Sequence, residues 1–336
     1  MEPVLDFEKP IATLEKKIQE LKALSENESV DFSSEIVVLE RKLQHLIQEI
    51  FDKLNPWQRV QLSRHPARPY TLDYIDLIFE NFVELHGDRC FGDDAAMVAG
   101  FASLEGKSVA VVGIQKGRNT KEKVARNFGM AKPEGYRKAL RVMKLAAQFD
   151  IPIVTFIDTP GAYPGVEAEE RGQSEAIARA ILESFDIQTP IIACIIGEGG
   201  SGGALAIGVA DAVLMQEYST YSVISPESCA SILWSDSSMC ETAASIMKMT
   251  PAALKPLAVI DQVVKEPAGG AHRNWPEAAR LLKEAIHKEL KKVTTLNTKQ
   301  LLEKRHQKFR TMGTNTLLLS ENTSSPAAQS IEDAST

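Results

Sequence analysis

Five of the seven residues in Gly197–Gly203 are glycine, and this run limits the fold more than any other feature of the chain. An apolar run, Pro190–Ile196, precedes it, and a run of mainly small residues, Ala204–Ala210, follows it. Glycine costs about 1 kcal/mol inside regular structure, but it accepts positive φ and lets other atoms approach its backbone. A turn from a strand into a helix uses both properties when its N–H groups bind a negative oxygen. We therefore expect a strand, a glycine turn and a helix, with an anionic ligand at the turn.

Short apolar runs alternate with helical patterns from Ala99 onward, and these runs show no polar alternation. Such strands, separated by helices, are typical of a mostly parallel sheet covered on both faces. The chain therefore predicts an α/β fold. The expected strands are Val109–Ile114, Ile151–Ile157, Ile191–Ile196, Val213–Met215 and Tyr221–Ile224, and the helices between them include Pro133–Phe149 and Gly172–Phe185.

Helical patterns mark both ends of the chain. Apolar residues recur at spacings of three and four from Ile11 to Leu24 and from Ile36 to Leu54. This spacing predicts two amphipathic helices in a hairpin that packs on the core or on a partner. The helical pattern resumes at Leu72–Leu85 and again at Pro276–Val293.

These patterns divide the chain into four regions. Beyond Met312 the residues are mainly Ser, Thr, Asn, Ala and Glu, which is typical of a disordered tail. We expect an N-terminal helical region at 1–70, a core at 71–271, a C-terminal helical region at 272–311 and a disordered tail at 312–336.

The composition argues against several classes of protein. The formal net charge of −7 gives no electrostatic reason to expect nucleic acid as a partner. The longest apolar runs are about a third of a membrane span, so we expect no membrane segment. The N-terminus is acidic and no apolar signal segment follows it, so we expect a cytoplasmic protein. The four cysteines form no C-x-x-C pair, and we expect no metal site in this chain.

A second loop shaped by glycine and proline follows the expected strand Ile151–Ile157. It reads Asp-Thr-Pro-Gly-Ala-Tyr-Pro-Gly from Asp158 to Gly165. GTPases also have an apolar strand that ends in Asp-Thr-Pro-Gly, but no G-x-x-x-x-G-K-[ST] loop is present here to bind the other phosphates. We therefore expect a ligand surface at the carboxyl end of a parallel strand, where open α/β sheets bind their ligands.

Basic residues follow the expected strand Val109–Ile114. Lys116 and Arg118 lie next to Gly113 and Gly117 at the strand end, and an anionic ligand is the favoured interpretation there. Lys121, Lys123 and Arg126 continue this first group. For the later cations, between Arg137 and Lys144, a solvated helix face is favoured instead.

The glycine run also fits G-x-G-x-x-G, the dinucleotide-binding pattern, and Glu217 follows twenty residues after Gly197. The helix expected next, about residues 203–209, is short for a crossover, and the run lies late in the chain. A nicotinamide-binding domain is therefore an alternative rather than the first interpretation.

The chain offers few side chains for nucleophilic or metal catalysis. It has no H-E-x-x-H pattern, and its six histidines are scattered. Glu167, Glu169 and Glu170 fit the first turn of a helix, a place that favours acidic side chains. The chemistry indicated is the stabilisation of an oxyanion by backbone N–H donors.

Five longer segments carry a resemblance to a known family. They are Glu84–Arg89, Phe128–Arg137, Phe156–Gly165, Gly197–Ala204 and Ser219–Glu227. Together they resemble the α subunit of the carboxyltransferase component of bacterial multisubunit acetyl-CoA carboxylase. The resemblance extends from about residue 5 to about residue 310.

This resemblance implies a crotonase-type fold, a spiral of ββα repeats with the helical hairpin as an N-terminal extension. It also implies transfer of a carboxyl group from N-carboxybiotin to acetyl-CoA, which forms malonyl-CoA in the first committed step of fatty acid synthesis. The amides of Gly202 and Gly203 would form an oxyanion hole for the biotin ureido oxygen, and Lys116 and Arg118 would bind substrate. The carboxybiotin pocket would consist of Gly161, Ala162, Tyr163, Gly165, Gly199 and Gly200.

Partners are implied by the same resemblance. Biotin would be attached to a biotin carboxyl carrier protein rather than to this chain, and biotin carboxylase would belong to the same ATP-dependent holoenzyme. The chain would act only in an α2β2 heterotetramer, whose β subunit holds the zinc and the oxyanion hole for the acetyl-CoA enolate. A stand-alone crotonase-type hydratase or decarboxylase is the main alternative.

Overall fold

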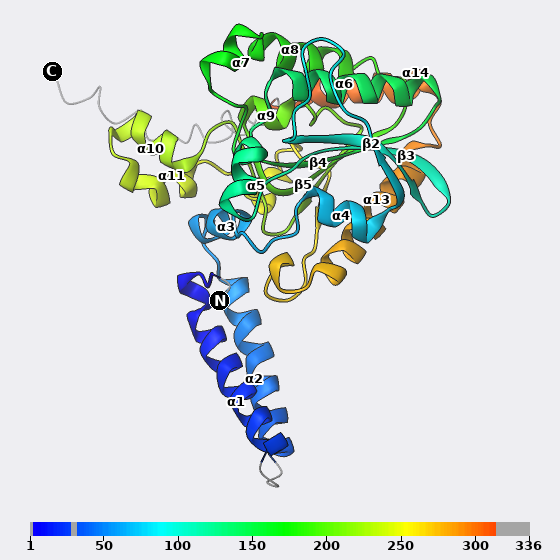
Figure 1. The fold of residues 1–336 in the computed structure, drawn as a ribbon. Helices are drawn as coiled ribbons and strands as arrows, with labels where there is room; N and C mark the ends of the chain where they lie inside the picture. The colour runs from blue at the N-terminus through cyan, green and yellow to red at the C-terminus, as the bar shows by residue number, and fades with distance from the viewer. Residues whose placement is uncertain (1–2, 28–31, 314–336) are drawn as a thin grey trace, which may run out of the picture.

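An eight-stranded mixed sheet forms the centre of the computed structural model, which describes residues 3–27 and 32–313 (Figure 1). Its order is β1-β2-β3-β4-β5-β6-β8, and β7 pairs with the end of β5. The first three strands are antiparallel neighbours, and the strands from β3 to β8 are parallel. The strands are β1 Glu80–Glu84, β2 Met97–Leu104, β3 Lys107–Ile114, β4 Ile153–Thr159, β5 Ile191–Gly200, β6 Ala212–Gln216, β7 Thr220–Ser222 and β8 Gln262–Val264.

Helices cover both faces of this sheet, as its uniformly apolar strands require. In β4, Ile153 and Ile157 face a core that contains residues of α6 (Pro133–Gln148) and α8 (Gln173–Ser184). Val154 and Phe156 face a second core, with residues of α4 (Thr71–Ile78) and α13 (Trp275–Val293). The predicted α/β sheet, buried on both sides, is therefore confirmed.

The helices α1 (Lys9–Asn27) and α2 (Ser33–Asp52) form the predicted hairpin, which extends away from the sheet (Figure 1). At its base, Ile11 and Phe51 lie in one apolar cluster with Leu62 of α3 (Pro56–Ser63) and with Tyr218. The hairpin thus packs on the body of its own chain at this end.

Polar contacts hold the start of the chain against two distant segments. Glu8 Oε1 lies 2.9 Å from His272 Nε2, and His65 Nε2 lies 2.8 Å from the carbonyl oxygen of Pro3. The rings of His65 and His272 are 4.3 Å apart. The N-terminal residues therefore contact the chain both just after α3 and just before α13.

One predicted helix is wrong in its second half. The pattern at Leu72–Leu85 forms α4 only as far as Ile78, and the edge strand β1 begins at Glu80. Asn81 has φ 53°, and the register of β1 on β2 shifts between Glu80 and Val83, so the chain leaves the helix through a bulge.

The strand β2 was not among the predicted elements. It pairs along its whole length with β3, and Glu105 and Gly106 join the two strands with φ of 51° and 78°. Positive φ at both central residues is the geometry of a tight hairpin turn. The remaining helices are α5 Thr120–Ala125, α7 Val166–Glu170, α9 Ser201–Leu205, α10 Pro226–Trp234, α11 Cys240–Ile246, α12 Pro251–Leu254 and α14 Thr298–Thr311.

The predicted boundary at residue 70 is crossed by a buried ion pair. Arg68 Nη1 lies 2.8 Å from a carboxylate oxygen of Glu266, and both side chains are almost fully buried. The limits of the four regions remain predictions, and the tail lies outside the described residues from position 314 onward. Among the described helices, none combines the length and apolar character that a membrane crossing needs.

Candidate functional site

The glycine run joins β5 to the short helix α9. β5 continues through Gly200, because Glu198, Gly199 and Gly200 pair with β7, and α9 begins at Ser201. Ser201 has φ 51°, so the chain turns sharply between strand and helix. Gly202 and Gly203 therefore lie in the first turn of α9, where backbone N–H groups have no carbonyl partner within the helix.

The second predicted loop lies directly against this turn. A Cβ on Gly203 would be 2.6 Å from the carbonyl carbon of Gly161 and 2.7 Å from the nitrogen of Ala162. A Cβ on Gly200 would be 2.3 Å from the carbonyl oxygen of Pro160. Real Cβ atoms do not approach this closely, so glycine is what allows the two loops to touch. The structure thus brings together the two glycine loops that the sequence singled out.

Space remains open beside this contact. A Cβ on Gly161, which has φ 155°, would meet nothing within 4 Å, and one on Gly202 would only reach ordinary contact with Ile177 at 3.5 Å. Thr159 Oγ1 donates to the carbonyl oxygen of Gly161 at 2.7 Å and accepts from its N–H at 3.1 Å. The loop is therefore fixed by its own side chain while one side of its glycine faces free space.

The other predicted pocket residues border the same loops. Tyr163 donates its N–H to the carbonyl oxygen of Ala131 at 3.1 Å, and Lys132 Nζ lies 4.7 Å from the centre of its ring. Gly165 precedes α7, and a Cβ there would be 2.3 Å from the Tyr163 ring. A Cβ on Gly199 would be 2.6 Å from the ring of Tyr221.

A cluster of buried charges lies at the start of both loops. Lys116 Nζ lies 2.8 Å from Asp158 Oδ1 and 2.7 Å from Glu198 Oε2. Arg64 Nε donates to Glu198 Oε1 at 2.6 Å, and Arg64 also pairs with Glu227. Burial opposes the charge on Lys116, but Asp158 and Glu198 outweigh it and raise the pKa of the ammonium. Burial likewise opposes the charge on Glu198, but Lys116 and Arg64 hold its pKa below the ordinary value.

Lys116 and Arg118, the two cations predicted to bind substrate, have different protein partners. Lys116 belongs to the charge cluster under the glycine run. Arg118 pairs with Asp73, and its guanidinium lies 4.5 Å from the ring centre of Tyr70 and 4.7 Å from that of Trp275. Both are already engaged by protein groups, which disfavours direct substrate binding by either.

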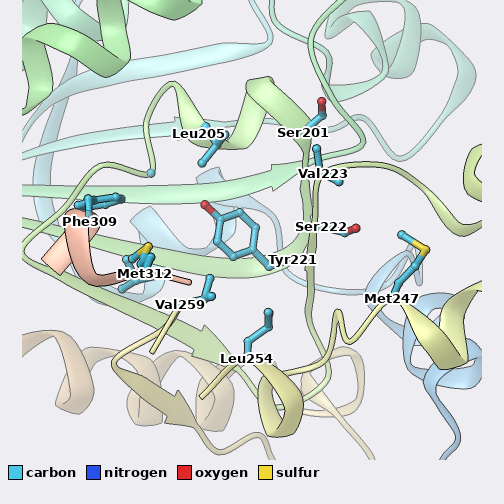
Figure 2. Close-up of a pocket in the computed structure, with 12 residues that line it drawn as sticks. Ser201, Leu205, Tyr221, Ser222, Val223, Met247, Leu254, Val259, Phe309 and Met312 are labelled. Atoms are coloured by element: carbon cyan, nitrogen blue, oxygen red, sulfur yellow. The ribbon is translucent and has the colours of Figure 1, made fainter. Parts of the chain in front are cut away.

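An apolar pocket that the sequence did not predict lies beside Ser201 and Leu205 of α9. Its volume is about 350 Å³, and Figure 2 shows Tyr221 among the lining side chains, with its hydroxyl toward Leu205. Burial raises the pKa of Tyr221 to about 12, so the phenol is neutral. The pocket joins residues from position 201 to position 312, and no local pattern in the sequence could indicate it.

Ser201, at the edge of this pocket, is also the middle residue of Gly199–Gly203, which fits G-x-S-x-G. That spacing places a nucleophilic serine on a strand-to-helix turn in α/β-hydrolases, where a histidine acts as base. None of the six histidines, all within the described part of the chain, is placed to act as this base. His65 and His272 contact the N-terminal residues, and His45 lies on α2. His86 pairs with Asp93, His287 pairs with Glu105, and the ring of His306 stacks on Phe185. The turn therefore favours backbone chemistry over a serine nucleophile.

Comparison with known proteins decides between the remaining interpretations. Residues 4–313 match the family described as acetyl co-enzyme A carboxylase carboxyltransferase-like. The acetyl-coenzyme A carboxylase carboxyl transferase subunit alpha of Dichelobacter nodosus is 57% identical over 309 residues, which are 92% of this chain and 97% of that protein. The subunit of the same name from Geobacter metallireducens is 58% identical over 308 residues, 92% of this chain and 96% of that protein.

The chain belongs to this family of carboxyltransferase α subunits. The resemblance seen in the five segments is confirmed, and with it the assignment as an enzyme subunit of acetyl-CoA carboxylase rather than a hydratase or a nicotinamide-binding domain.

Solved structures agree on the fold. A Pseudomonas malonate decarboxylase hetero-tetramer chain superposes with a TM-score of 0.56 at 15% identity, over 75% of this chain and 98% of that one. Transcarboxylase 12S superposes with a TM-score of 0.55 at 21% identity, over 68% of this chain and less than half, 42%, of that chain. The expected crotonase-type fold is confirmed by these carboxyltransferase-like neighbours.

Proposed function

We propose that this chain forms the carboxybiotin half of a carboxyltransferase site that converts acetyl-CoA to malonyl-CoA. The observation that carries the proposal is the contact of Gly203 with Gly161 and Ala162, beside the open space at Gly161 and Gly202. This arrangement leaves a narrow surface of bare backbone that a flat ring can approach. The N–H groups of Gly202 and Gly203, in the first turn of α9, lie at this surface.

A ureido group suits these donors. Its oxygen can accept two hydrogen bonds, and the N–H groups of Gly202 and Gly203 lack partners inside the helix. Ala162, Tyr163 and Gly165 would border the ring on one side, and Gly199 and Gly200 on the other. The bare backbone at Gly161 and Gly202 thus supports carboxybiotin as the ligand.

The protein groups stabilise charge rather than move protons. When bound, carboxybiotin would supply the carboxyl group, and the biotin nitrogen that is left would accept the methyl proton of acetyl-CoA. The amides of Gly202 and Gly203 would stabilise the negative charge that gathers on the ureido oxygen, and one well-aimed donor contributes about 3 kcal/mol. Lys116 stays protonated between its two carboxylates and is therefore not the base.

The partners follow from the same assignment. We propose an α2β2 assembly in which the β subunit alone holds zinc and stabilises the acetyl-CoA enolate, with a biotin carboxyl carrier protein and biotin carboxylase as further partners. The absence of a C-x-x-C pair in this sequence supports placing zinc on the β subunit. We also propose that the enzyme works in the cytoplasm.

The test is dependence on the β subunit. Because this chain would stabilise only one of the two oxyanions, we expect the purified chain alone not to decarboxylate malonyl-CoA. With β subunit and free biotin added, CO2 release from malonyl-CoA should appear. Full turnover by the chain alone, at a purity that excludes host enzyme, would instead support a stand-alone decarboxylase.

A further inference from the structure

Lys116 follows the first of three adjacent parallel strands whose carboxyl ends carry the candidate site. It lies two residues after β3, Asp158 lies near the end of β4, and Glu198 lies near the end of β5. The side chain of Lys116 is only 14% exposed, and its single ammonium contacts both carboxylates, at 2.8 and 2.7 Å. Each of these carboxylates lies at the start of one of the two glycine loops.

We propose that Lys116 is a positioning residue, whose ammonium holds the Asp158–Gly165 loop and the Gly197–Gly203 run at the separation that aims the Gly202 and Gly203 amides. This inference rests on the proposed function, because it takes those amides to be the oxyanion donors.

The carboxylate of Asp158 already packs on the backbone of the glycine run. Its Oδ1 accepts the N–H of Glu198 at 3.0 Å, and a Cβ on Gly197 would lie 2.4 Å from the same atom. Lys116, together with Arg64 on Glu198, therefore offsets the charges of two carboxylates that would otherwise repel each other across a contact with no free space. Because both carboxylates are largely buried, water screens the repulsion between them only weakly.

The two loops also touch further along, at Gly161 and Gly203, so a change at their start reaches the candidate donors. Gly161 lies three positions after Asp158, Thr159 fixes it, and it is in contact with Gly203. Loss of the shared ammonium would shift one loop against the other by pushing Asp158 and Glu198 apart. The amides of Gly202 and Gly203 would then move with the glycine run.

A substrate-binding role for Lys116 predicts a different result. An ammonium that bound the phosphates of CoA would have to give up Asp158 or Glu198, and its loss would raise the KM for malonyl-CoA. A positioning role leaves that KM unchanged and lowers kcat, because the acyl-CoA would be held mainly by the β subunit.

The experiment compares Lys116→Met with Lys107→Met, an exposed lysine at the opposite end of the same strand β3. Both are assembled with β subunit and assayed for biotin-dependent decarboxylation of malonyl-CoA. We expect Lys116→Met to lose about a hundredfold in kcat, as small misplacements of reacting groups do, with the KM for malonyl-CoA within about twofold. Lys107→Met should match the wild type.

A second variant distinguishes loss of the Lys116 charge from loss of its packing. The double variant Lys116→Met/Glu198→Gln removes one charge of each sign and should recover part of the lost kcat. In Lys116→Met alone, Glu198 keeps Arg64 but loses one of its two cations. Its pKa should therefore rise, and the acidic limb of the pH–kcat profile should move to higher pH.

Wild-type kcat in assembled Lys116→Met, a loss confined to the KM for malonyl-CoA, or a double variant no faster than Lys116→Met would each overturn the proposal. If Lys116→Met fails to assemble, the double variant carries the test, since it should then assemble and turn over. Failure of the proposed function would be visible earlier, as a wild-type complex without biotin-dependent activity.

Discussion

Substitution of Gly203 by alanine tests the backbone site by adding a single methyl group. The new Cβ would lie 2.6 Å from the carbonyl carbon of Gly161, about 0.8 Å closer than the 3.4 Å at which ordinary contact begins. Because the neighbouring atoms belong to the backbone, the Asp158–Gly165 loop must shift as a unit. A misplacement of about 1 Å costs on the order of a hundredfold in rate, close to the loss of one oxyanion donor. We therefore expect Gly203→Ala to lose about a hundredfold in kcat in the assembled enzyme.

Two neighbouring variants separate a displaced loop from a lost hydroxyl or a blocked ligand. Gly202→Ala meets Ile177 only at 3.5 Å, so its melting temperature should equal that of the wild type while the KM for biotin rises. Ser201→Ala keeps every backbone donor and should retain most activity. The assay is malonyl-CoA decarboxylation with free biotin, measured beside melting temperature and β-subunit assembly. If Ser201→Ala is inactive and Gly203→Ala is active, the hydroxyl carries the chemistry and the backbone assignment is refuted.

Two predictions concern stability rather than catalysis. Burial, together with the nearby His272, lowers the pKa of His65 from its usual 6.5. The unfolded chain therefore binds this proton more readily than the folded chain does. The free energy of unfolding should fall as the pH drops below about 6.5. His65→Gln should flatten that part of the melting temperature–pH curve, and an unchanged slope would contradict the assignment. Arg305 is fully buried, with Nη2 2.7 Å from Asp211, so Arg305→Met should cost about 3–5 kcal/mol of unfolding free energy. Exposed Lys304→Met on the same helix should cost almost nothing, and equal melting curves for the two would show that the pair does not matter.

Among the strands, those that the sequence located best are buried on both faces. β4 is buried at every residue, and its uniformly apolar run was sufficient to locate it. β1 is an exposed edge strand whose apolar residues fit a helical spacing equally well, and only pairing with β2 decides between the two structures. β2 contains Gly100 and Ser103 and carries no strong strand pattern, although the Glu105–Gly106 turn after it was a usable hairpin signal.

The glycine loops could be found from the sequence, but not the charges beneath them. Gly161 and Gly203 stand out because of the residues around them, and their contact follows from β4 and β5 being neighbours. Lys116 was predicted to bind substrate because it lies beside glycines at a strand end, whereas its two carboxylates lie some forty and eighty residues away along the chain. Only the strand order β3-β4-β5 brings Asp158 and Glu198 to its ammonium.

The contact between the start of the chain and the segment just before α13 has a consequence for synthesis on the ribosome. Glu8 meets His272 across 264 residues, so the base of the helical hairpin cannot dock until most of the protein has emerged. At about 5–20 residues per second, that interval lasts tens of seconds or less. During this time α1 and α2 cover each other's apolar sides, with Leu62 of α3 the next residue of their cluster to emerge, and the ion pair between Lys22 and Glu40 links the two helices. The hairpin must therefore be the first part of the nascent chain to form and among the last to find its place.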